Sequence, residues 1–128
     1  MELAFEKMQG LLPAVIQDAA TGEVLMLGFM NGESVELTQR TGEVYFFSRS
    51  RNKLWKKGES SGHVLLVKEI RVDCDADSLL VRVEAKGPGV CHEGYRSCFF
   101  RDLENDGSAR VVEEKTFEVE SVYGKGAE

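Results

Sequence analysis

Apolar residues in the first third of the chain fall into two short runs separated by a polar turn. The first run extends from Leu12 to Asp18 and the second from Val24 to Met30. The intervening segment from Ala20 to Glu23 has the sequence ATGE, which is suited to a turn. Two apolar runs of this length on either side of a turn predict a β-hairpin.

One helix is predicted directly after this hairpin. Asn31 is a favourable N-cap residue, and the segment that follows it can remain helical through about Arg40. Val35 and Leu37 follow the helical period only loosely, so the boundary residues carry most of this prediction. Gly42 is well placed to adopt the left-handed conformation that ends many helices.

Four further segments have the composition of strands. The segment from Glu43 to Ser48 is rich in aromatic residues, and the segments His63 to Cys74 and Leu79 to Glu84 alternate partly between apolar and charged residues. Arg110 to Val122 suggests one or two closing strands, and the last residues, 124–128, suggest a frayed tail. Glycine-punctuated polar stretches at residues 49–62 and 86–98 are predicted to be loops.

These elements predict one domain over residues 1–128, of the mainly β or α+β class, with one or two helices. So few helices leave much of a sheet uncovered, and we therefore expect the sheet to be strongly curved.

The charge and the absence of export signals narrow the functional classes. A formal net charge of -6 argues against a protein built to bind nucleic acid, which requires an excess of basic residues. The N-terminus lacks the features of a secretory signal, and no apolar run approaches the roughly 18 residues of a membrane span. We therefore expect a cytoplasmic protein that binds neither nucleic acid nor a membrane.

Three cysteines in such a chain are better candidates for metal ligands than for disulfides. Cys74, Cys91 and Cys98 have the spacings C-x16-C and C-x6-C, which match no zinc-finger pattern. The alternative is that they are small buried apolar residues. Cys91 and Cys98 nevertheless lie in a polar, glycine-rich stretch, and His92 follows Cys91 directly, which favours the metal interpretation.

Three thiolates would leave the fourth position of a tetrahedral zinc ion open to water, as in catalytic sites. Zinc lowers the pKa of bound water from about 15.7 to about 7, so hydroxide would form without a strong base. His92 or a nearby carboxylate is then the candidate for proton transfer.

Asp73, Asp75 and Asp77 alternate with the first cysteine and predict a second, harder metal such as magnesium. In a straight strand their α-carbons would be about 6.6 Å apart, too far for all three to bind one ion directly. The chain must therefore bend at this point or use bridging waters, and Asp-Ala-Asp-Ser is suited to a turn.

Two alternatives exist for these aspartates. With Glu84 they occupy four positions of an EF-hand loop, but Ser78 stands where that loop needs glycine, and a strand pattern follows where a helix should. The other alternative is a solvated acidic turn without a metal.

Basic side chains surround the single tryptophan in the polar stretch 49–62. Guanidinium groups bind phosphate in a bidentate manner, and an indole offers a face on which a base can stack. A phosphorylated nucleotide is therefore a candidate ligand, and a solvated loop is the alternative. The candidate substrate-binding residues are Arg49, Arg51, Trp55, Lys57 and Ser60.

The ordered blocks of the sequence resemble those of the phosphoribosyl-AMP cyclohydrolase family of histidine biosynthesis. The blocks are LPAVIQDAATGEVLMLGFMN from Leu12, SRSRNKLWKKGESSGH from Ser48, IRVDCDADSLL from Ile70 and CHEGYRSCFF from Cys91. The resemblance covers residues 8–123, nearly the whole chain.

The resemblance implies a buckled, barrel-like mixed sheet and an intertwined homodimer with one zinc and one magnesium ion per subunit. It implies that Cys74, Cys91 and Cys98 bind zinc, with Cys74 supplied by the opposite subunit, and that Asp73, Asp75 and Asp77 bind magnesium. The implied reaction is hydrolysis of the N1–C6 bond of the adenine ring by zinc-bound hydroxide, which gives a formimino carboxamide nucleotide. Magnesium would assist substrate binding, and His92 would transfer protons.

The sequence departs from the family at two positions and leaves two other classes open. The family stretch CHTGRRSC here has Glu93 and Tyr95, which changes two side chains beside the ligands. A zinc-type deaminase would need the motif P-C-x-x-C, whereas Cys91 and Cys98 are too far apart for it. A non-catalytic domain stabilised by metal remains the other alternative.

Overall fold

The core of the molecule is a mixed four-stranded sheet with the strand order β2-β1-β6-β5. The computed structural model describes residues 1–122, so the frayed tail predicted at residues 124–128 lies outside the described residues. In chain order the elements are η1 (Phe5–Met8), β1 (Leu12–Asp18), β2 (Val24–Met30), α1 (Gly32–Thr41), β3 (Tyr45–Ser48), β4 (Lys53–Lys56), β5 (Leu65–Val72), β6 (Leu79–Ala85), β7 (Arg101–Leu103), β8 (Ala109–Val111) and α2 (Val119–Val122).

The first hairpin forms as predicted, because its turn satisfies its own backbone. One carboxylate oxygen of Asp18 accepts hydrogen bonds from the N–H groups of Ala20 (2.8 Å) and Thr21 (2.9 Å). β1 pairs with β2 in antiparallel fashion and with β6 in parallel fashion, and β6 pairs antiparallel with β5. The mixed sheet is therefore confirmed, and across residues 1–122 it stays open rather than closing into a barrel.

Strand β1 shows why this sheet is stable. Its residues alternate between buried and partly buried positions, and Leu12, Ala14 and Ile16 have no exposed surface. Side chains at every second position share one face of a strand, so these three contribute to one apolar layer. The other apolar residues with no exposed surface are Leu25, Val44, Leu65, Val81 and Val83.

Helix α1 is the predicted helix, with boundaries fixed by its caps. The Asn31 side chain accepts from the Ser34 N–H (2.9 Å), and the Ser34 hydroxyl accepts from the Asn31 N–H (2.8 Å). This reciprocal capping box satisfies two N–H groups at the start of the helix. At the other end, Gly42 has φ 75° and its N–H donates to Thr38 O.

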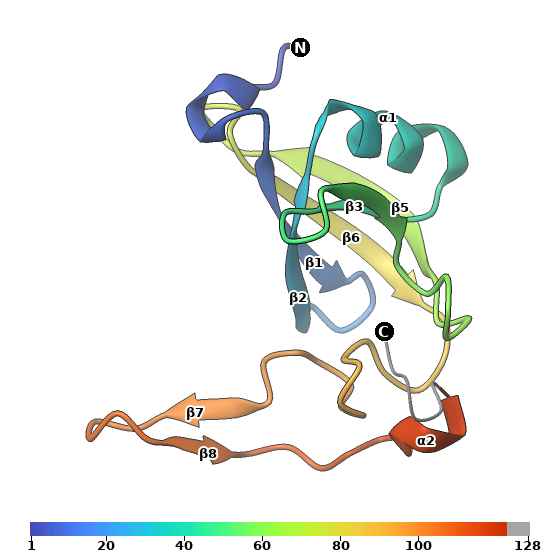
Figure 1. Cartoon of the computed structure of the whole chain (residues 1–128), viewed down its shortest axis with the longest axis vertical. Helices are drawn as coiled ribbons and strands as arrows, with labels where there is room; N and C mark the ends of the chain where they lie inside the picture. The colour runs from blue at the N-terminus through green and yellow to red at the C-terminus, as the bar shows by residue number, and fades with distance from the viewer. Residues whose placement is uncertain (123–128) are drawn as a thin grey trace.

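The predicted loops and closing strands required correction. The basic stretch contains a strand, β4, which pairs with β3 so that Phe46 lies opposite Trp55. The closing segment predicted at Arg110–Val122 is a strand only at its start, in β8, because its polar residues have no core to cover. Figure 1 shows β7 and β8 as a separate arm at the end of the molecule opposite η1.

Candidate functional site

A cavity of about 280 Å³ opens where the β3–β4 hairpin meets the loop that carries two cysteines. Hydroxyl groups, basic groups, one indole, one imidazole and one carboxylate face it. The lining residues are Ser48, Ser50, Arg51, Lys53, Trp55, Lys57, Glu59, Ser60 and His92. The cavity thus combines positively charged side chains with an aromatic ring and an imidazole.

Lys57 is the buried cation of this cavity, with only 6% of its surface exposed. Its backbone N–H donates to Val44 O (3.0 Å), and its Nζ lies 5.7 Å from the centre of the Trp55 ring. Lysine is rarely buried without a partner, because its charge is costly to desolvate. Its side chain is also close enough to Cys98 for its charge to favour a thiolate there.

The loop that follows β6 is folded so that its two cysteines meet. The Val90 N–H donates to Arg96 O and the Cys91 N–H donates to Tyr95 O, both at 3.0 Å. We call residues 90–98 the cysteine loop. The Cys98 thiol donates a hydrogen bond to the Cys91 sulfur, which lowers the pKa of Cys91 to about 6. The same bond, together with burial, raises the pKa of the Cys98 thiol.

Cys74 does not join the other two cysteines within the described chain. It is exposed and lies in the turn between β5 and β6, which Figure 1 shows beside η1, whereas the cysteine loop lies at the opposite end of the sheet. Two of the three predicted zinc ligands are therefore brought together by the fold of one chain.

The three aspartates lie together in the turn between β5 and β6. The bend considered for this segment is confirmed, since the chain turns here and Ala76 adopts φ 62°. One carboxylate oxygen from each of Asp73, Asp75 and Asp77 lies within 4.8 Å of the other two. Within positions 1–122, no other group of three or more His, Cys, Asp or Glu side chains brings its ligand atoms this close together. The bend supplies the convergence that a straight strand would deny.

The electrostatics of this cluster indicate a site for positive charge. Hydrogen bonds that the protonated Asp77 makes to the carboxylates of Asp75 and Asp73 raise the pKa of Asp77, and the negative charge of Asp73 adds to this effect. Lys7 places its Nζ 3.2 Å from Asp75 Oδ2 and 3.4 Å from Asp77 Oδ2. A cation therefore already sits against this cluster in the form of a lysine. Hydrogen bonds, the largest from the Ser78 hydroxyl, lower the pKa of Asp73.

Four of the five predicted substrate-binding residues line the cavity with His92, and one does not. Arg49 lies outside it, with its guanidinium 3.8 Å from the centre of the Phe29 ring. The prediction missed Ser48, Ser50, Lys53 and Glu59 as lining residues. The β3–β4 register brings the ends of the two strands together, and recognising β4 as a strand would have indicated Ser48 and Lys53, which pair with each other.

None of the helices in the described part of the chain is long and apolar enough to cross a membrane.

Comparison with known proteins places the site in context. Residues 26–100 match the family model for phosphoribosyl-AMP cyclohydrolase. The chain is 59% identical to a phosphoribosyl-AMP cyclohydrolase of Solibacter usitatus, over 97% of this chain and 98% of that protein. Proteins of the same name from Pelotomaculum thermopropionicum (59% identical, 91% and 89% covered) and Methanosarcina barkeri (58% identical, 94% and 89% covered) are similar along nearly their whole length.

Proposed function

Because the chain belongs to the phosphoribosyl-AMP cyclohydrolase family, we propose that it opens the adenine ring of phosphoribosyl-AMP by hydrolysis, as a step of histidine biosynthesis. The observation that carries this proposal is the cavity itself, in which basic side chains, an indole and an imidazole converge. Those groups suit the phosphates, the base and the proton transfers of this reaction.

Each side of the cavity has a task in the proposed reaction. Arg51 and Lys53 bind phosphate oxygens by charge-assisted hydrogen bonds, and the face of Trp55 stacks on the purine. The oxygen of water bonds to C6 and becomes the carboxamide oxygen, the N1–C6 bond breaks, and of the two protons of water one goes to N1 and the other to the exocyclic nitrogen. His92 lines the same cavity and moves the first of these protons from water to N1.

We propose that Cys91 and Cys98 hold zinc together with Cys74 of a second copy of the chain. The donor set fits this metal, because two thiols already lie in hydrogen-bond contact and the pKa of Cys91 is lowered to about 6. When bound, zinc supplies the Lewis acidity that makes water reactive near neutral pH. The shared arrangement is supported by the location of Cys74 at the opposite end of the sheet.

We further propose that Asp73, Asp75 and Asp77 hold magnesium. Their converging oxygens are the hard ligands that this ion prefers, and their mutual repulsion is relieved by a divalent cation. Lys7 would then release the two carboxylates that it contacts. Magnesium commonly keeps open positions for phosphate oxygens, which links this cluster to a phosphorylated substrate.

The test is the ultraviolet spectrum of phosphoribosyl-AMP incubated with the purified protein. The protein is used as prepared, after chelation, and after zinc and magnesium are restored separately and together. We expect spectral change from ring opening, its loss on chelation, and full recovery only with both metals. A folded, metal-replete protein that leaves the spectrum unchanged would refute the proposed activity.

A further inference from the structure

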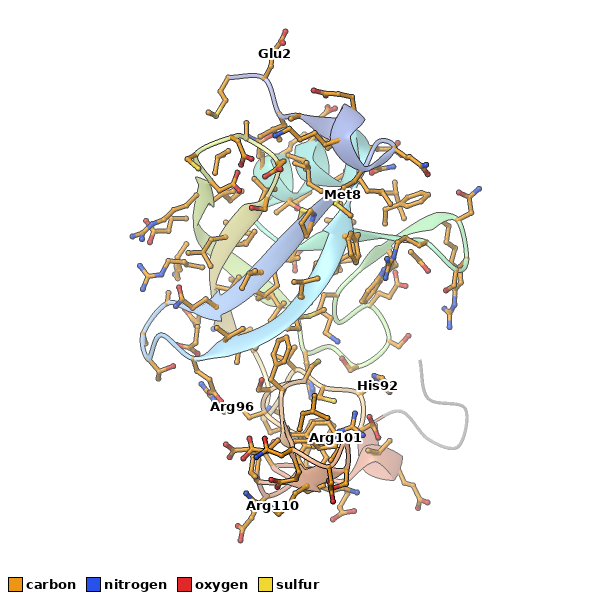
Figure 2. The ribbon with its side chains drawn as sticks, turned by 90° about the vertical axis from the view of Figure 1, so that its left-hand side faces the viewer. Glu2, Met8, His92, Arg96, Arg101 and Arg110 are labelled. Carbon is orange, nitrogen blue, oxygen red and sulfur yellow. The ribbon has the colours of Figure 1, made fainter. Side chains whose placement is uncertain are left out.

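Arg96 connects the cysteine loop to the hairpin of β1 and β2. Its Nε lies 2.5 Å from Glu23 Oε1, and its Nη2 lies 3.0 Å from Asp18 Oδ2. Figure 2 shows Arg96 near the β1–β2 turn, on the other side of the loop from His92. Arg96 is therefore outside the cavity and has its own binding partners.

Asp18, one of the two carboxylates that Arg96 contacts, is buried and held by backbone hydrogen bonds. Only 8% of its surface is exposed, and its second carboxylate oxygen is held by the N–H groups of Ala20 and Thr21. Hydrogen bonds from Thr21 and Ala20, with the charge of Arg96, keep the pKa of Asp18 below its ordinary value. The guanidinium thus meets a buried, fixed and ionised partner.

The residues after Arg96 extend this attachment up to the thiol. The Ser97 hydroxyl donates to Val24 O (2.8 Å), and the Cys98 N–H donates to Leu25 O (2.7 Å). On its other side, the Arg96 carbonyl accepts from the Val90 N–H (3.0 Å), next to Cys91. Arg96 therefore lies in the chain between the two thiols, its carbonyl holds the Val90 end of the cysteine loop, and its side chain attaches the loop to Asp18 and Glu23.

From these contacts we infer that Arg96 is a positioning residue, which through Asp18 and Glu23 holds the Cys91 and Cys98 thiols in the geometry that binds zinc. The inference rests on the proposed zinc site and extends it to residues that touch neither metal nor substrate. Groups that orient metal ligands in this way typically change metal affinity by about 10- to 100-fold when they are removed.

The experiment compares Arg96→Gln with Arg110→Gln in the full-length protein. Arg110 is a matched control, because it also contacts two carboxylates, with Nε 2.7 Å from Glu104 and Nη2 3.4 Å from Asp102, but it lies on β8 away from the cysteines. Zinc affinity is measured by competition with a chromogenic chelator. Cobalt is bound in place of zinc to report, through its visible absorption bands, the geometry of the thiolate ligands.

We expect Arg96→Gln to weaken zinc binding by about 10- to 100-fold and to alter the cobalt spectrum, with Arg110→Gln unchanged in both. Arg96→Lys keeps the positive charge, and its zinc affinity should lie between those of Arg96→Gln and Arg110→Gln. If Arg96→Gln fails to fold, Arg96→Lys serves as the test. Parental zinc affinity and an unaltered cobalt spectrum in the folded Arg96 variants would overturn the inference. If the unmutated protein itself binds no zinc, it is the proposed zinc site that fails.

Discussion

The buried ammonium group of Lys57 gives the clearest prediction for a single residue. Replacement by methionine keeps an apolar stem of similar length and removes the charge near the Cys98 thiol. Hydrogen bonds to charged groups contribute about 1.5–3 kcal/mol, so we expect kcat/KM to fall by about 10- to 100-fold. Initial rates of ring opening measure this effect.

Lys56 supplies the control for that substitution. It neighbours Lys57 in sequence but its Nζ lies 3.6 Å from Glu43 Oε2, and it is not among the residues that line the cavity. We expect Lys56→Met to keep nearly parental kcat/KM. Equal losses in the two variants would show that total charge, rather than the buried cation, supports the reaction.

Asp77 gives a prediction that depends on pH. The raised pKa of this carboxyl means that the folded state holds its proton more tightly than the unfolded state. Stability therefore falls as pH rises from the unfolded to the folded pKa, and remains reduced above it. Asp77→Asn removes this penalty, so in metal-free protein at pH 7 we expect a higher urea midpoint than in the parent.

Two comparisons check the origin of this gain. The advantage of Asp77→Asn should disappear as pH falls through the carboxyl's folded pKa, and magnesium should raise the Tm of the parent more than that of the variant. A variant less stable than metal-free parent at pH 7 would contradict the repulsion argument.

At the scale of elements, the connection between β4 and β5 depends on Gly58. This residue has φ +88°, and a β-carbon there would lie 2.6 Å from the backbone of His63 and Val64. Gly107, in the turn between β7 and β8, has a similar φ of +91° but open space around it. Alanine at either position would have the same backbone strain, but only alanine at position 58 would also collide with neighbouring atoms. Comparing the two substitutions therefore separates strain from steric collision.

We expect Gly107→Ala to cost about 1–2 kcal/mol, the strain of a left-handed conformation for alanine. Gly58→Ala pays the same strain and must also displace backbone, so its loss should be clearly larger. Denaturant midpoints with unchanged m-values measure both effects. Similar losses of stability at the two positions would show that the connection between β4 and β5 can shift to accommodate the added β-carbon.

The elements that the sequence predicted share one property, which is a local signal strong enough to specify them. Strand β1 has regular alternation and α1 has a capping box and a terminal glycine. Strand β4 was missed because it is short, begins and ends with lysine and lies in a polar stretch, and only its pairing with the aromatic strand β3 makes it a strand. Its structure depends on a partner that local pattern does not reveal.

The candidate site shows the same limit. The cysteine and aspartate clusters and the bend near Ala76 could be predicted from residue type, but the hydrogen-bond contact between Cys91 and Cys98 depends on tertiary folding. Arg96 carried no sequence signal for its role, because its partners Asp18 and Glu23 are over 70 residues away in the chain. Such contacts follow from the sheet, which sets which loops meet.

At the scale of the whole molecule, the arm of β7 and β8 has no core of its own. All of its strand residues are exposed, including Leu103 at 81%. A two-stranded hairpin is at best marginally stable alone in water. An arm of this kind is consistent with the proposed pairing of two chains, in which the thiols at opposite ends of the sheet would come together.

Co-expression of two inactive chains tests this pairing. Cys74→Ala and Cys91→Ala chains, with different tags, should each lack zinc-dependent activity, while a heterodimer regains one complete site. With random pairing, about half of the dimers contain one chain of each kind. Each of these mixed dimers has one complete zinc site and one incomplete site, so about a quarter of the parental activity should return.

The matched control is the combination of Cys91→Ala with Cys98→Ala. These two cysteines belong to the same loop of one chain, so exchange of subunits rebuilds no complete site and activity should stay absent. Recovery in the first combination alone would establish that Cys74 comes from the other subunit. Without recovery in either combination, despite confirmed heterodimers, each site must be complete within one chain, and the turn between β5 and β6 would have to move toward the cysteine loop.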